Sequence, residues 1–189
     1  KHNKVRKIPD LFKSCLDTYF RVKSFGSNIT SSASITVTQE NCKNIENIFN
    51  YMFYDCKIDS IKGILVRDEG VYKTPEKERK KIFEAYTWLV DKITEFTEKG
   101  LMKNHNKDSL QGKLHNAKDK ISYGLVKKMY LEPHYISPCH AGSLFGVITA
   151  SGLVYPCEIL DDKLLGDLRK NNMNFKEIWE NKESIEAKK

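Results

Sequence analysis

The chain has 189 residues, of which 40% are hydrophobic and 30% charged, a balance that is ordinary for a soluble globular protein. No run approaches the roughly 18 consecutive apolar residues of a membrane span, and the start carries no signal-peptide pattern, so we expect no membrane partner. The five cysteines are odd in number and irregularly spaced. A disulfide framework is therefore disfavoured, and we expect a reducing, cytoplasmic location.

The formal net charge is +7 and the pI about 9.0, which raises the question of an acidic partner. The basic residues are dispersed, and their one cluster, at residues 77–81, falls in the first turns of a predicted helix. No aromatic residues that would stack on bases are interleaved with it. We interpret the cluster as a solvated helix face and regard nucleic acid as a disfavoured partner.

The first predicted elements are a helix and a β-α-β unit. The helix spans residues 10–25 and ends at Gly26, a residue suited to a C-cap. Residues 33–38 alternate apolar and polar types and are rich in β-branched residues, which predicts a strand. A helix capped by Thr38 is predicted to run to about residue 55, followed by a short strand over 61–67. Strand, helix and strand within about 35 residues indicate parallel pairing of the two strands.

Two longer helices are predicted next. Thr74-Pro75-Glu76 opens the first with a cap, a proline and an acid, and this helix stops before Gly100. The second is predicted over residues 113–130. From residue 138 the sequence becomes rich in glycine, strand and turn signals. We therefore place a domain boundary within residues 131–138, which gives domains 1–135 and 136–189.

Three of the cysteines are predicted to be structural. Cys42 and Cys56 continue the apolar stripe of the helix between the two strands, and about 21 Å of helix would separate them, too far to pair or to share a metal ion. Cys15 lies on the first helix near Leu11 and Leu16. Because free cysteine is among the most buried residue types, we expect all three in the hydrophobic core.

The other two cysteines, Cys139 and Cys157, flank a predicted β-hairpin. Residues 143–149 and 153–156 have strand character, and between them Gly152 is free to take a positive φ in the turn. An antiparallel hairpin brings its two ends together, so the two thiols should be near neighbours. Three alternatives remain open from the spacing: two core cysteines, a disulfide, or a thiolate pair that binds zinc or an iron–sulfur cluster.

Cys139, Gly152 and Cys157 form a C-x12-G-x4-C pattern. This pattern resembles the opening signature of the SPASM and twitch domains, which are C-terminal extensions of many radical S-adenosylmethionine (radical SAM) enzymes. The continuation is similar too, because in that family a Tyr-Pro-Cys is followed by Gly-X-Leu-Arg and then by Ile-Trp. The matching residues here are Gly166, Leu168, Arg169, Ile178 and Trp179. The resemblance covers about residues 136–183.

The resemblance extends upstream more loosely, where the strand-helix-strand segment is similar to the late part of a partial (β/α)6 barrel. It implies an α/β fold in which residues 1–135 are the later part of that barrel with a helical linker. Residues 136–189 would then be a small α+β domain of the SPASM or twitch type, containing the hairpin. It also implies that Arg67, at the end of the second strand, lies near the S-adenosylmethionine site.

The cofactor that the resemblance implies for this segment is an auxiliary 4Fe–4S cluster, with Cys139 and Cys157 as two of its ligands. It further implies S-adenosylmethionine and a catalytic 4Fe–4S cluster in the full-length protein. The CxxxCxxC motif for that catalytic cluster is absent, and no cysteine follows Cys157. We therefore expect a piece of a longer oxidoreductase or maturase, with no turnover by itself.

The partners implied by the family are a peptide or protein substrate and an electron donor such as a flavodoxin or a ferredoxin. The alternative is a small zinc-binding or nucleic-acid-binding module without catalytic activity, which would use the same two thiolates and the basic surface. A metal analysis would distinguish them, because an iron–sulfur protein absorbs broadly near 400 nm and a zinc protein is colourless.

Overall fold

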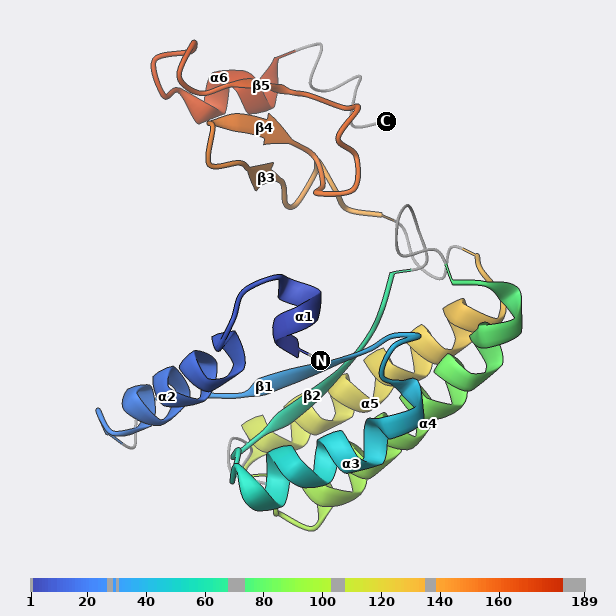
Figure 1. The fold of residues 1–189 in the computed structure, drawn as a ribbon. Coiled ribbons are helices and arrows are strands. Elements are labelled where there is room, and N and C mark those ends of the chain that lie inside the picture. Colours follow the sequence, from blue (N-terminus) through green and yellow to red (C-terminus); the bar gives the residue numbers. More distant parts are fainter. Residues whose placement is uncertain are drawn as a thin grey trace. The chain divides into compact units, whose positions relative to one another are not determined.

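In the computed structural model, residues 2–26, 29, 31–67, 74–102, 108–134 and 139–181 are described. The chain divides into two compact units, Lys1–His134 and Tyr135–Lys189, which we call unit 1 and unit 2 (Figure 1). No helix within the described ranges is long and apolar enough to cross a membrane.

Unit 1 is organised around two parallel strands, β1 (Ala33–Val37) and β2 (Ile61–Leu65). They pair in register from Ala33 opposite Ile61 to Val37 opposite Leu65, and backbone hydrogen bonds continue the pairing at both ends. The predicted β-α-β unit and its parallel strands are therefore confirmed. The two strands make up the whole sheet of unit 1 in the described residues, and these residues form no closed barrel.

The predicted helix between the strands is real but divided into three parts. It begins with a 3-10 turn, η1 (Cys42–Asn44), continues as α3 (Ile45–Asn50) and ends as a π-helical stretch, η2 (Tyr51–Asp55). The predicted start at Thr38 is wrong, because the Asn41 side chain holds the preceding turn. Asn41 Oδ1 accepts from the Thr38 backbone N–H at 2.8 Å, and its Nδ2 donates to the Thr36 carbonyl at 2.8 Å.

The N-terminal segment forms two helices, α1 (His2–Arg6) and α2 (Leu11–Lys23). Helix α2 is shorter at its end than the predicted 10–25, and Gly26 beyond it has φ 138°. Asp10, the residue before α2, has a left-handed backbone and makes no capping hydrogen bond with its side chain.

Two long helices cover the sheet, α4 (Glu76–Glu98) and α5 (Leu110–Leu131), and they run alongside α3 beneath the strands in Figure 1. Helix α5 begins three residues before the predicted residue 113. The reason is a cap: Ser109 Oγ accepts from the Gly112 N–H at 3.0 Å and satisfies a donor that the first turn would otherwise leave unpaired.

The core of unit 1 lies between one face of the sheet and these helices. Side chains alternate along the strands as the pleat requires, so Ile35, Val37 and Ile61 are at most 5% exposed. Helix α4 approaches β2 at Gly63, where an added Cβ would lie 2.8 Å from Val90 Cγ1. The buried residues of α4 are Ile82, Ala85, Tyr86, Leu89, Val90, Ile93 and Phe96.

Unit 2 is a small antiparallel sheet of three strands with one short helix. The strands β3 (Val147–Ile148), β4 (Leu153–Tyr155) and β5 (Gly166–Asp167) pair in the order β3-β4-β5, and α6 is Phe175–Glu180. The predicted hairpin is confirmed, with Gly152 in its turn at φ 89°. The third strand was not predicted, because two residues are too short to show a period.

The first strand of the hairpin is much shorter than the predicted 143–149. Residues 140–145 fold into a turn instead: the Gly142 N–H donates to the Phe145 carbonyl at 2.8 Å, and the Leu144 N–H donates to the His140 carbonyl at 3.0 Å. An isolated parallel bridge joins Ala141 to Phe145. Small and turn-forming residues here satisfy their backbone groups locally, which leaves none for an extended ladder.

Candidate metal centre

The two hairpin cysteines are accessible and unpaired. Cys139 is exposed and Cys157 partly exposed, and neither forms a disulfide. Of the three alternatives left by the sequence, the structure therefore supports neither a buried pair nor a disulfide. Free, accessible thiols are the form in which cysteine serves as a metal ligand.

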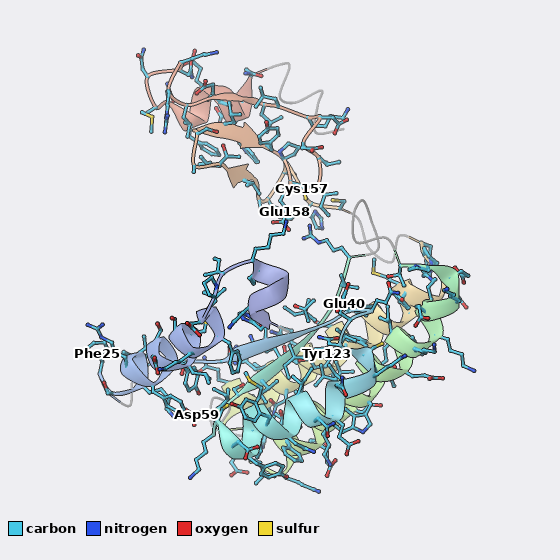
Figure 2. All side chains as sticks on the ribbon, in the orientation of Figure 1. Phe25, Glu40, Asp59, Tyr123, Cys157 and Glu158 are labelled. Carbon is cyan, nitrogen blue, oxygen red and sulfur yellow. The ribbon has the colours of Figure 1, made fainter. Side chains whose placement is uncertain are left out.

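Cys157 emerges from the hairpin directly after a buried residue. Pro156 is under 2% exposed, while Cys157 beyond it reaches the surface. Figure 2 labels Cys157 and Glu158 where the chain leaves β4. The proline therefore secures the backbone on the core side, and the thiol that follows it is left available.

Cys139 leads into the hairpin by a different path from the one expected. The register pairs Val147 with Tyr155, so continuing it would set Phe145, rather than Cys139, opposite Cys157. The turn over 140–145 then folds back and brings Ala141 beside Phe145. The turn thus replaces the long strand that we expected to lead to Cys139, and it links the segment of Cys139 to the start of β3.

The residues of the Gly-X-Leu-Arg and Ile-Trp motifs pack unit 2 together. Leu168 and Ile178 are 6% and 3% exposed and form its core with Val154 and Leu165. An added Cβ on Gly166 would lie 2.8 Å from Ile178 Cγ2, so glycine is required there for space. The motif therefore marks the scaffold that carries the two cysteines.

Arg169 secures the turn end of the hairpin. Its Nη2 donates to the Ala150 carbonyl at 3.0 Å, and its stem lies against Gly152, where an added Cβ would be 3.1 Å from Arg169 Cγ. The Asp167 carboxylate accepts from the Arg169 backbone N–H at 2.9 Å. A guanidinium from the segment after β5 thus adds a long-range contact to the local hydrogen bonds of the turn.

The two cysteines are suitable ligands for a metal centre, but they do not complete a ligand set within the residues that the structure describes. No three His, Cys, Asp or Glu side chains in those ranges are grouped so that they could hold a metal ion. The two accessible thiols fit as part of a ligand set, since iron–sulfur clusters are held mainly by cysteine thiolates. They would leave further positions to other ligands.

The remaining cysteines divide differently from the expectation. Cys42 and Cys56 are each 7% exposed and belong to the core of unit 1, which confirms their structural role. Cys15 is exposed, so its predicted burial is wrong. The physical reason is that no residue of α2 is buried, because other elements cover the apolar side of this helix only in part. A hydrophobic neighbourhood in sequence does not bury a residue unless another element covers that helix face.

Arg67 lies two residues beyond the end of β2 at Leu65 and is exposed. The carboxyl ends of parallel strands are where α/β proteins bind ligands, and the Val66 N–H donates to the Val37 carbonyl at 3.0 Å, so pairing continues to this edge. Glu40 follows β1 at the same edge (Figure 2) and was not singled out from the sequence. Its position after a strand end is the signal that could have identified it.

The basic cluster at 77–81 lies in the first turns of α4, and its side chains pair with acids of the same helix. Lys81 and Lys80 lie 3.4 and 3.9 Å from Glu78 and Glu84, respectively. Arg79 stacks over the Tyr130 ring at 4.5 Å and donates to the Tyr130 carbonyl at 2.9 Å. The exposed lysines agree with the interpretation of the cluster as a solvated helix face, whereas Arg79 is partly buried against α5.

Comparison with known families identifies the C-terminal part of the chain. Residues 139–189 match the SPASM domain, an iron–sulfur cluster-binding domain, and the match begins at Cys139. It implies an iron–sulfur cluster in this segment. No curated protein and no solved structure matches the chain.

Proposed function

We propose that this chain is part of a radical SAM enzyme, in which Cys139 and Cys157 supply two thiolate ligands of an auxiliary 4Fe–4S cluster. The observation that carries the proposal is the coincidence of two findings. The family match begins at Cys139, and both thiols are free and accessible in segments that flank the hairpin. When bound, such a cluster supplies electron transfer or a site for the substrate.

The residues of unit 2 would hold the two accessible thiolates in place. The core of unit 2 is small, and among its described residues the buried cluster is Val154, Leu165, Leu168 and Ile178. Domains with so little core usually depend on a disulfide, a metal or a partner for stability, and unit 2 has no disulfide. A bound cluster would meet that need.

For unit 1 we propose the role of the later barrel segment, with Arg67 near bound S-adenosylmethionine. Its support is the parallel β1-β2 pair, whose carboxyl edge carries Arg67 and Glu40. A peptide or protein substrate, an electron donor such as a flavodoxin or ferredoxin, a catalytic 4Fe–4S cluster and a cytoplasmic location belong to the same proposal.

The first test is the iron, sulfide and zinc content of the full-length protein purified without oxygen, together with its absorbance spectrum. We expect more than about four irons per chain and broad absorbance near 400 nm. The double variant Cys139→Ser with Cys157→Ser should lose the auxiliary share of the iron, whereas Cys15→Ser, which removes another exposed thiol, should keep it. Equal iron and sulfide in all three proteins would contradict the proposal. Zinc without iron would favour the zinc-binding alternative.

A further inference from the structure

The open end of the hairpin is held by an aromatic side chain from α6. An added Cβ on Gly146 would lie 2.7 and 2.9 Å from Trp179 Cζ3 and Cη2, so the indole lies directly on the glycine backbone. The same Cβ would lie 2.9 Å from the Tyr155 carbonyl oxygen. Trp179 thus contacts the hairpin at the point where the two strands separate, two residues before Cys157.

The position of Trp179 is itself well defined. Its ring stacks on Phe175, one helical turn earlier, with centroids 5.3 Å apart and an interplanar angle of 25°. The neighbouring Ile178 is 3% exposed and anchors α6 in the core. Helix α6 begins with a capping hydrogen bond from the Glu177 N–H to Asn174 Oδ1 at 3.2 Å. The indole is therefore pressed against Gly146 by a fixed helix.

We infer that Trp179 is a positioning residue for the cysteine end of the hairpin, holding the segments that carry Cys139 and Cys157 in the spacing that one cluster requires. The inference rests on the proposed function and adds a residue that is not a ligand. Groups that orient metal ligands from outside typically change metal retention by about 10–100-fold when removed. Trp179 would act by fixing the backbone through the contact of its six-membered ring with Gly146.

Arg169 provides a matched control, because it secures the same hairpin at the opposite, turn end. Removing its hydrogen bond to Ala150 loosens the hairpin but leaves Gly146 and Trp179 in contact. A general weakening of unit 2 would affect cluster retention in both variants alike. A positioning role for Trp179 predicts that cluster retention falls in the Trp179 variant and not in the Arg169 variant.

The experiment measures the rate at which an iron chelator removes the auxiliary cluster from the full-length protein, followed by absorbance without oxygen. We expect loss to be about tenfold faster in Trp179→Ala, and close to wild type in Trp179→Phe, which keeps an aromatic cover. Gly146→Ala places a methyl group against the intact indole and also against the Tyr155 carbonyl oxygen, so it should lose the cluster at least as fast as Trp179→Ala. Arg169→Ala should stay within about twofold of the wild type.

Two outcomes would overturn the inference while leaving the proposed function in place. One is wild-type retention of iron in both Trp179→Ala and Gly146→Ala. The other is equally fast loss in Arg169→Ala, which would show that any weakening of the hairpin suffices. If the wild-type protein takes up no auxiliary iron at all, the proposed function itself fails, and the inference with it.

Discussion

Close approach between elements depends on single glycines in both units. At Gly63 the strand β2 meets Val90 of α4, at Gly166 the strand β5 meets Ile178, and at Gly146 the hairpin meets Trp179. None of these three glycines has a positive φ. They are required because a methyl group would occupy space that a neighbouring side chain already fills.

Substitution of glycine by alanine should therefore have opposite effects at two positions of unit 1. At Gly63 an added Cβ would lie 2.8 Å from Val90 Cγ1, and we expect Gly63→Ala to lower the free energy of unfolding by about 1–3 kcal/mol. At Gly124, on α5, an added Cβ meets nothing within 4 Å. Gly124→Ala should raise stability by up to about 1 kcal/mol, because alanine favours the helix.

Urea unfolding followed by circular dichroism would measure both variants against the wild type. Equal effects of the same sign at the two positions would show that the packing at Gly63 is not as close as described.

At the scale of the element, α5 carries apolar residues on two opposite sides. Tyr123, Val126 and Tyr130 pack against the core of unit 1. The other side is exposed and also apolar, with Leu110, Leu114, Ile121, Leu125 and Met129 between 40% and 75% exposed. This explains why the helical period of α5 is weak in the sequence. Apolar residues lie on both sides of the helix, so no single apolar stripe marks the side that faces the core.

Substitutions on the exposed side of α5 should be nearly neutral for stability. Ile121 is 63% exposed, so we expect Ile121→Asn to change the free energy of unfolding by no more than about 0.5 kcal/mol. Leu89 of α4 is 0% exposed, and Leu89→Ala should cost about 2–5 kcal/mol through lost burial and a cavity. The comparison is again made by urea unfolding. A large loss in Ile121→Asn would mean that this side of α5 is covered in solution.

At the scale of the whole molecule, a buried tyrosine and a partly buried neighbour link the stability of unit 1 to alkaline pH. Tyr86 is 1% exposed, and its ring lies 6.5 Å from that of Tyr123. Burial raises the pKa of Tyr86 well above its ordinary value of 10.0, with a smaller contribution from the nearby Tyr123, and burial also raises the pKa of Tyr123. The phenolate is disfavoured in the core because charge there is poorly solvated.

The raised pKa values determine the direction of the pH dependence. Below about pH 10 both the folded and unfolded chains keep these protons, so the stabilisation is fully present. Above it the unfolded chain ionises first, and the free energy of unfolding falls as the pH rises through the higher folded pKa values. We expect Tyr86→Phe to reduce this fall, as measured by urea unfolding between pH 8 and 11. An unchanged slope in the variant would show that Tyr86 does not contribute.

Much of unit 1 could be predicted from the sequence, because its strands and long helices have periods that local physics determines. The β1-β2 pair and α4 follow from alternation and capping, and in unit 2 the hairpin turn at Gly152 follows from glycine chemistry. The departures from these predictions did not follow from the sequence periods. The late start of the helix after β1 depends on the Asn41 side chain bonding to the Thr36 carbonyl, a contact that no period reveals. Cys15 is exposed because no described residue covers it on α2.

The sequence by itself determined which residues could serve a metal site in this protein: the spacing of Cys139, Gly152 and Cys157 and the motif after them are readable without coordinates. Only the tertiary structure decided how they are held. The turn over 140–145 redirects Cys139, Arg169 secures one end of the hairpin, and Trp179 contacts the other. The turn is made by local hydrogen bonds, but the contacts of Arg169 and Trp179 join residues up to 33 positions apart, as between Gly146 and Trp179, so packing rather than local preference establishes them.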